Sequence, residues 1–246
     1  MNTFSDSVST AVGLVLSMDP GLWAVVGRSL AVSATACLLA CAVGLSVGAW
    51  LGVARFRGRG AVITVLNAAL AVPSVVVGLV VYLVLSRSGP LGFLVWLFSF
   101  QAMVLAQTLL VLPVAIALTR QAVEDVDRQH GEQLASLGAR VGWRGALLAW
   151  DERYALLTVV ITVFGRAIAE VGAVMIVGGN IDGFTRVMTT AIALETSKGD
   201  LPMALGLGIV LMAVVLLLNA LVSLLRRWRE RVDTAPVHAG AMGWSA

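Results

Sequence analysis

Four long runs without a charged residue dominate this chain of 246 residues. An α-helix rises about 1.5 Å per residue, so roughly 20 apolar residues cross the hydrocarbon core of a bilayer. Charged residues make up only 13% of the chain, whereas soluble domains carry about 25%. We therefore predict an all-α, polytopic bundle of transmembrane helices. The uncharged runs are Ser29–Ala54, Gly60–Ser86, Ser88–Thr119 and Leu201–Leu225.

Arginine residues gather in three places along the chain. They follow the first run, occupy the polar segment 119–153, and follow the last run. All three groups fall on one side of the membrane if the chain crosses five times, and the positive-inside rule makes that side the cytoplasm. The predicted spans are about Leu22–Ala54, Ala61–Leu85, Leu91–Leu118, Tyr154–Gly178 and Leu201–Leu225.

This arrangement predicts the position of both ends of the chain. Residues 1–21 lie outside or at the outer interface, residues 22–225 form the membrane domain, and residues 226–246 form a cytoplasmic tail. A sixth helix stays open, either in the N-terminal segment or in Thr185–Leu194. The segment 119–153 holds ten or more charged residues between uncharged runs, and we interpret it as a cytoplasmic loop that docks a partner.

Two charged residues interrupt the fourth predicted span. Arg166 and Glu170 are four residues apart, which places them on one face of a helix about one turn from each other. A lone charge in hydrocarbon costs at least about 2.5–3.5 kcal/mol, so such residues face a protein interior or a water-filled path. One interpretation is a pair that fixes helix packing, and the other is a polar element of a translocation route. The sequence leaves open whether the two residues bind each other.

Glycine and proline predict where the helices bend. The segment Gly178–Arg186 is rich in Gly, Asn and Asp, which predicts a turn on the outer side; its backbone N–H groups also suit an anion. Pro73 and Pro113 lie inside predicted spans, where proline removes a helix hydrogen bond. We predict a kink or a break at each.

Catalytic patterns are absent from the sequence. The two histidines, His130 and His238, have no ligand-type partners at useful spacing, and Cys37 and Cys41 lie in an apolar span. The chain has no His-Glu-x-x-His motif and no Gly-x-x-x-x-Gly-Lys-Ser/Thr loop. We predict a non-enzymatic chain that binds neither a metal nor a cofactor, so energy must come from a partner or an ion gradient.

The polar segment contains Glu132-x-x-x-x-Leu137-Gly138-Ala139, and the second predicted span contains Ala71–Leu79, followed by Ser88–Gly92. These motifs resemble, in the same order, the permease subunits of ABC importers for molybdate, tungstate and sulfate. The first is similar to the cytoplasmic coupling motif of these permeases, and the other two are similar to their second span. The long segment Gly165–Gly199 looks most like the tungstate-type branch. The sequence departs from the family at Gln133 and Leu134, where alanines are usual, and at Trp150–Arg153, where Leu-Pro is usual.

The resemblance implies a type I permease fold in the plasma or inner membrane and a role as one subunit of an importer. Two copies would form a homodimer in the bilayer, each binding an ABC ATPase subunit that carries ATP and Mg²⁺. An external binding protein would deliver tungstate or molybdate, and no nucleic acid is expected as a partner. Glu132 is expected near the start of a short coupling helix and Gly138 at a bend. The implied coupling residues are Glu132, Leu137, Gly138 and Ala139, and those implied near the path are Arg166, Glu170, Asn180 and Arg186.

Other functions stay open at this point. The substrate can be another anion such as sulfate, or the chain can be a secondary transporter that needs no ATPase. A secondary transporter would often show inverted internal repeats, and the sequence shows no convincing repeat. An intramembrane enzyme would need a catalytic constellation inside the spans, where neither histidine lies.

Overall fold

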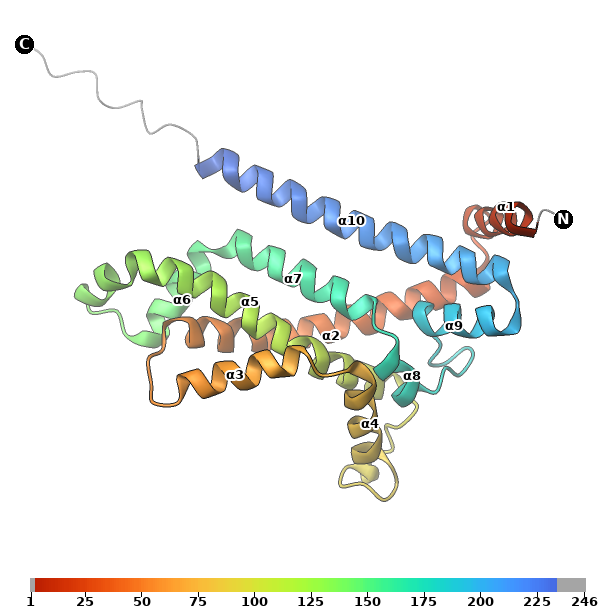
Figure 1. The fold of residues 1–246 in the computed structure, drawn as a ribbon, viewed down its shortest axis with the longest axis horizontal. Coiled ribbons are helices and arrows are strands. Elements are labelled where there is room, and N and C mark those ends of the chain that lie inside the picture. Colours follow the sequence, from red (N-terminus) through yellow and green to blue (C-terminus); the bar gives the residue numbers. More distant parts are fainter. Residues whose placement is uncertain (1–2, 234–246) are drawn as a thin grey trace, which may run out of the picture.

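The computed structural model describes residues 3–233, and within this range the chain is helical with no strand (Figure 1). The short 3₁₀ helix η1 covers Gly92–Leu94. The tail predicted at 226–246 is described only as far as Asp233, where the last helix ends, and residues 234–246 lie outside the described residues. The α-helices are α1 (Thr3–Leu16), α2 (Pro20–Val53), α3 (Arg59–Leu70), α4 (Ser74–Leu85), α5 (Phe100–Ser136), α6 (Val141–Asp151), α7 (Arg153–Ile168), α8 (Gly172–Gly178), α9 (Met188–Lys198) and α10 (Leu201–Asp233).

The centre of the bundle is the pair α2 and α5, which pack side by side in parallel. Glycines recur every four residues along the contact face of α2, and small residues at such positions let two backbones approach closely. A β-carbon added at Gly44 would lie 2.5 Å from that of Ala115, and one added at Gly48 would lie 2.7 Å from the carbonyl oxygen of Ile116. The glycine face of α2 therefore sets how closely the two helices pack.

Within the described residues, α2, α5 and α10 are long and apolar enough to cross a membrane alone. The pairs α3–α4 and α7–α8 pass the same test as bent units, with bends of 98° and 58°, so the structure has three spans or up to five. The prediction of an all-α polytopic fold is confirmed. The two segments left open for a sixth span form α1 and α9, which have 14 and 11 residues. Both are shorter than the roughly 20 residues that a span needs.

The third predicted span differs from the helix observed. We predicted a span from Leu91 to Leu118, but α5 begins at Phe100, where the Ser99 side chain accepts a hydrogen bond from the Ala102 N–H at 3.4 Å. Residues 86–99 form turns and the short helix η1 instead, and the N–H of Phe98 donates to the carbonyl of Val177 at 3.0 Å. At its other end, α5 continues 18 residues past Leu118. The polar segment 119–153 is therefore mostly helix rather than loop.

The two prolines have different surroundings. Pro73 is the residue before α4, at the 98° bend between α3 and α4, and Figure 1 shows α4 projecting away from the long axis of the bundle. Pro113 lies inside α5, which continues through it as a helix. A proline ring removes one backbone hydrogen bond in either case. The packing of α5 along α2 supplies the contacts that keep α5 helical there.

Candidate functional site

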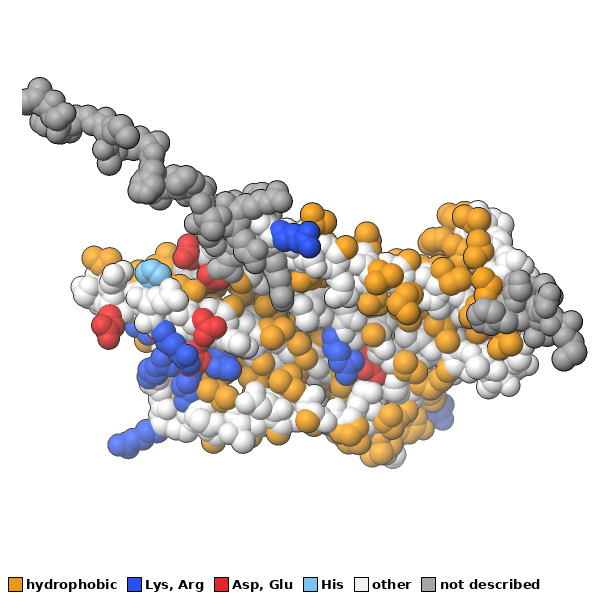
Figure 2. All heavy atoms as spheres, turned by 45° about the horizontal axis from the view of Figure 1, so that its top comes forward, with side chains coloured by type: hydrophobic (Ala, Val, Ile, Leu, Met, Phe, Trp, Pro, Cys, Tyr) orange, Lys and Arg blue, Asp and Glu red, His pale blue; other side chains and the backbone are white. Residues whose placement is uncertain are grey.

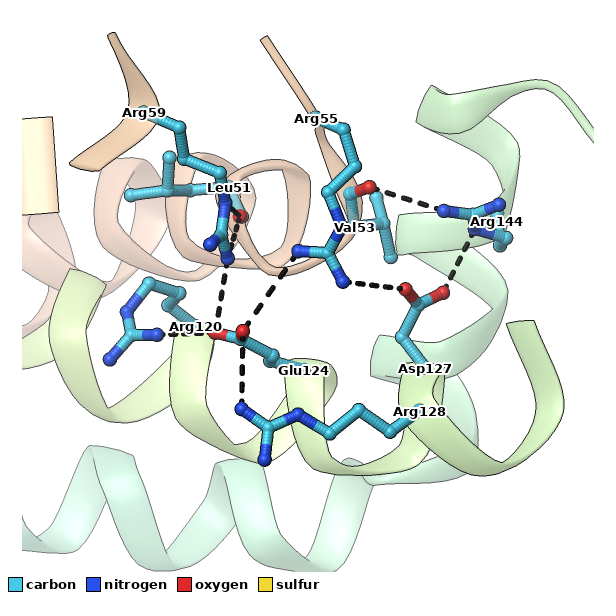
Figure 3. Close-up of polar contacts among 9 residues, drawn as sticks. All are labelled: Leu51, Val53, Arg55, Arg59, Arg120, Glu124, Asp127, Arg128 and Arg144. Atoms are coloured by element: carbon cyan, nitrogen blue, oxygen red, sulfur yellow. Dashed lines mark hydrogen bonds and ion pairs between the residues drawn. The ribbon is translucent and has the colours of Figure 1, made fainter. Parts of the chain in front are cut away.

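Two buried carboxylates on the C-terminal half of α5 hold a group of arginines (Figure 3). Glu124 and Asp127 are only 7% and 8% exposed. Glu124 pairs with Arg59 at the start of α3 at 3.0 Å, and Asp127 pairs with Arg144 on α6 at 2.9 Å. The other ion pairs of these carboxylates are Glu124 with Arg120, Glu124 with Arg128 at 3.4 Å, Glu124 with Arg55 at 3.9 Å and Asp127 with Arg55 at 3.8 Å. We call these seven residues the arginine network.

The arginine network also holds the end of α2. The last carbonyls of a helix have no partner within the helix. Arg59 donates to the carbonyl of Leu51 at 3.2 Å, and Arg144 donates to the carbonyl of Val53 at 3.1 Å. Because Arg59 belongs to α3 and Arg144 to α6, four helices meet in one network of ion pairs and charge-assisted hydrogen bonds.

Glu124 lies beyond the uncharged part of α5, which ends at Thr119. Its burial alone raises the pKa of the carboxyl, because burial disfavours the charged form. The hydrogen bond and charge of Arg59, together with Arg120 and Arg128, outweigh this effect and hold the pKa of Glu124 below its ordinary value. The carboxylate is therefore ionised at neutral pH.

The residues proposed for ATPase coupling lie where α5 turns into α6. Gly138 has a φ of +81°, a left-handed conformation that glycine adopts at little cost. Glu132 is exposed in the last turns of α5, whereas we expected it near the start of a short helix; α6 begins only at Val141. Extension of α5 through the polar segment accounts for the difference. Leu137 and Ala139 flank Gly138 in the connection between the two helices.

Exposed apolar side chains surround this connection. Leu137 and Trp143 are 83% and 71% exposed, and Leu147 is exposed beside them. They line a hollow of about 500 Å³ together with Leu134, Gly138, Ala139 and Arg140, and we call this surface the tip hollow. Figure 2 shows charged side chains gathered at the end of the molecule where α5 meets α6. Exposed apolar patches with polar surroundings are typical of interaction sites.

The intramembrane charges predicted in the fourth span come together. Arg166 Nη1 lies 2.9 Å from Glu170 Oε2, which answers the question that the sequence left open. Arg166 is in the last turn of α7, and Glu170 lies in the short break between α7 and α8. The Glu170 side chain is 4% exposed and that of Arg166 is 46% exposed.

Side chains from two other helices satisfy the backbone at this break. Gln107 on α5 donates to the carbonyl of Ala167 at 3.0 Å, and Thr189 on α9 donates to the carbonyl of Glu170 at 2.7 Å. The N–H of Ala173, at the start of α8, donates to Glu170 Oε1 at 3.2 Å. An interrupted helix in a membrane needs such partners for its freed polar groups.

The breaks of the two bent spans lie against each other. A β-carbon added at Gly172 would lie 2.8 Å from Val75 on α4, and one added at Gly78 would lie 2.7 Å from the Cα atom of Ala173. The start of α8 therefore packs directly on the first turns of α4. Movement at one break must be accommodated by the other.

Asn180 and Arg186 lie in the connection between α8 and α9. The Asn180 side chain donates to the carbonyl of Thr190 at 3.4 Å. Arg186 forms ion pairs with Asp182 at 3.0 Å and with Glu195 at 3.9 Å. Among the four residues predicted near the path, the structure thus pairs Arg166 with Glu170. The partners of Asn180 and Arg186 lie in the same connection and in α9.

Sequence reasoning missed the carboxylates of the arginine network and the polar partners at the break. A signal for the network was present, because Arg120, Glu124 and Arg128 follow one another at four-residue intervals on one helix face. Gln107, within an uncharged run, was a weaker signal for a buried polar contact. The roles of Arg59 and Arg144 had no local signal, since their partners lie on other helices.

Comparison with known proteins places this architecture in a family. No family model matches the chain. The tungstate uptake system permease protein TupB of Peptoclostridium acidaminophilum is 40% identical over 226 residues, which cover 90% of this chain and 97% of the relative. The chain belongs to the ABC transporter permeases of tungstate and related anion uptake systems. The resemblance found in the sequence is confirmed.

Two further relatives support the assignment of this permease. A probable anion ABC transporter permease protein of Haloferax volcanii is 42% identical over 208 residues, covering 82% of this chain and 88% of the relative. The TupB protein of Campylobacter jejuni is 34% identical over 222 residues, covering 90% and 93%. Sulfate permeases match at lower identity or over less of the chain. The permease is thus a multi-pass membrane protein with a transport role rather than an enzyme.

Proposed function

We propose that this permease is the membrane subunit of an ATP-driven importer that takes up tungstate. The observation that carries the proposal is the exposed apolar tip hollow, found on a permease that is 40% identical to a tungstate uptake permease over 90% of its length. Tungstate and molybdate are tetrahedral dianions of nearly equal size, so molybdate is a second substrate of the same site. A secondary transporter would have no need of such a docking surface.

The tip hollow is the surface that suits an ABC ATPase subunit. Leu137, Trp143 and Leu147 would enter a cleft on that subunit, which would carry ATP and Mg²⁺. Glu132 and Arg140 offer charges at the edge of the apolar surface. Gly138 provides the bend that presents the surface, with Ala139 beside it.

The arginine network gives the docked helix a rigid connection to the membrane helices. Arg144 on α6 reaches both Asp127 on α5 and the end of α2. Gly145 lies against the backbone of α2, where an added β-carbon would be 3.0 Å from the carbonyl oxygen of Ala49. Closure of the ATPase subunits on ATP would therefore move α6 and the cytoplasmic ends of α2, α3 and α5 together.

A second copy of the permease completes the translocation path in this proposal. The two copies would form an isologous dimer, as is usual for homo-oligomers. The half-exposed Arg166 would face the path rather than lipid. In the orientation predicted from the arginine distribution, the arginine network faces the cytoplasm, so an external binding protein would dock on the opposite side from the tip hollow.

Uptake by the reconstituted complex tests the proposal. The permease, its ATPase and the binding protein are placed in liposomes, and uptake of tungstate, molybdate and sulfate is measured with and without ATP. We expect ATP-dependent uptake of tungstate that requires the binding protein and that molybdate inhibits. Uptake without an ATPase, or uptake of sulfate but not tungstate, would contradict the proposal.

A further inference from the structure

We propose that the Arg166 guanidinium is a binding site for the transported tetrahedral dianion, and that Glu170 occupies this site when the anion is absent. The inference rests on the proposed function and adds a residue and a mechanism to it. In the structure the two side chains form an ion pair at 2.9 Å. The dianion would replace Glu170 as the partner of Arg166 during transport.

The carboxylate of Glu170 bridges two helices that meet at an angle of 58°. Its Oε2 atom binds Arg166 at the end of α7, and its Oε1 atom accepts the N–H of Ala173 at the start of α8. The ion pair therefore spans the hinge between the two halves of a broken span. A change in the bend moves Arg166 relative to Glu170.

The surroundings of the two partners differ. Glu170 is held inside the protein by α8 and α9, through the N–H of Ala173 and through Thr189, which binds the Glu170 carbonyl at 2.7 Å. The Arg166 side chain is nearly half exposed and belongs to α7. Movement of α7 relative to α8 and α9 would take the guanidinium away and leave the carboxylate in place.

Arg166 stands at the end of a polar row on α7. Thr158 and Thr162 precede it at four-residue intervals, which places the three residues on one face of the helix. Two hollows follow this face, one of about 390 Å³ between α7 and α10 and one of about 380 Å³ that reaches Asp125 on α5. Asn219 and Ser223 on α10 line the first hollow. These four polar side chains each donate to the carbonyl four residues earlier in their own helix. The nearly half-exposed guanidinium of Arg166 is therefore the group on this face that would be costly in lipid.

Exchange of partners explains how a dianion can bind and still leave. The closed pair has no net charge, so it attracts an anion weakly. A separated guanidinium presents parallel N–H donors that match two oxygens of a tetrahedral oxyanion. The buried carboxylate left behind keeps its hydrogen bond from the Ala173 N–H but loses its charged partner, so it competes for Arg166 and favours release of the anion.

Binding of tungstate to the detergent-solubilised permease–ATPase complex, without the binding protein, tests the exchange. The substitution Glu170→Gln removes the competing charge and keeps an oxygen that can accept the Ala173 N–H. We expect Glu170→Gln to lower the tungstate Kd about tenfold in equilibrium dialysis, because a hydrogen-bonded charge partner contributes on this scale. Adding Arg166→Gln to Glu170→Gln should abolish this gain in tungstate affinity. Adding Arg166→Lys instead should keep part of it.

Arg153→Gln is the matched control, since it removes an arginine from the other end of α7. Its tungstate Kd should equal that of the wild type. Co-elution of each variant with the ATPase shows that the complex is folded. The exchange is wrong if Glu170→Gln binds tungstate no more tightly than the wild type, or if the gain persists with Arg166→Gln.

Tungstate uptake by the single variant Arg166→Gln gives a second test. This test does not depend on a substitution at the buried Glu170. We expect tungstate uptake to fall at least tenfold in liposomes. If Arg166→Gln takes up tungstate as fast as the wild type does, the exchange is wrong and the proposed function stands. Wild-type uptake of sulfate but not tungstate would overturn the proposed substrate, and loss of sulfate uptake in Arg166→Gln would still support the exchange.

Discussion

Arg144 on α6 contacts Asp127 on α5 at 2.9 Å while donating to the carbonyl of Val53, the last residue of α2, at 3.1 Å. One side chain thus ties the helix beside the tip hollow to two membrane-spanning helices. Arg144 and Asp127 have side chains only 15% and 6% exposed, so water screens this contact weakly. A force applied to α6 would pass directly to α2 and α5.

Arg144→Gln should uncouple ATP hydrolysis from transport. Removing one partner of a buried ion pair costs roughly 3 kcal/mol, because the other charge stays buried. We expect a lower melting temperature of the detergent-solubilised complex and a loss of most of the ATPase stimulation by the loaded binding protein. Arg57→Gln, which changes an exposed arginine in the connection between α2 and α3, is the matched control. Equal stimulation in both variants would show that α6 is coupled through other contacts.

Acid should destabilise the permease through Glu124. Its pKa is lowered from 4.5 in the folded state, so the carboxylate contributes stability that is fully present above about pH 4.5 and is lost as the pH falls through the lowered value. Glu124→Gln should therefore reduce the melting temperature at pH 7 and make it depend less on pH below 4.5. Asp125→Asn, on an exposed neighbour, should keep the wild-type acid dependence. A parallel loss in both variants would contradict this assignment.

Composition predicted the membrane helices well because partition into a bilayer depends on the whole run of residues. The same reasoning failed at Leu91–Ser99, which is as apolar as the helix that follows. There Val95 and Phe98 adopt positive φ values of 52° and 59°, and Phe98 packs edge to face on Tyr82 with ring centroids 6.1 Å apart. Contacts with distant residues outweigh local helix preference here. The hydrophobicity of the segment does not predict those contacts.

The same distinction between local pattern and long-range packing applies to the candidate sites. The four-residue spacing of Arg166 and Glu170 predicted a shared face, and the ion pair is observed. Arg59 and Glu124 are 65 positions apart and meet only because α3 packs on α5. Composition identified the two segments that contain these residues as polar or basic. Which residue pairs with which depends on how the helices pack.

Gly138→Asp should detach the ATPase subunit from a folded permease. Aspartate tolerates the left-handed backbone better than most residues, but it places a charge in the apolar tip hollow. We expect co-purification of the ATPase to fall at least tenfold while the permease keeps its elution volume in gel filtration. Gly142→Ala, in a helical position where an added β-carbon meets no atom within 4 Å, should retain the ATPase. Retention in both variants would exclude the tip hollow as the docking surface.

Gly48→Val should disrupt the bundle itself. A β-carbon at this position would lie 2.7 Å from the carbonyl oxygen of Ile116 and 2.7 Å from the β-carbon of Thr119, so α2 and α5 would have to separate. Overpacking of a buried interface costs about 1–3 kcal/mol, and backbone contact gives little room to relax. We expect a lower melting temperature and a smaller yield of the folded protein. Gly27→Ala on the same helix meets no atom within 4 Å and should behave as the wild type. Equal melting temperatures for Gly48→Val and the wild type would mean that the two helices pack less closely than the structure shows.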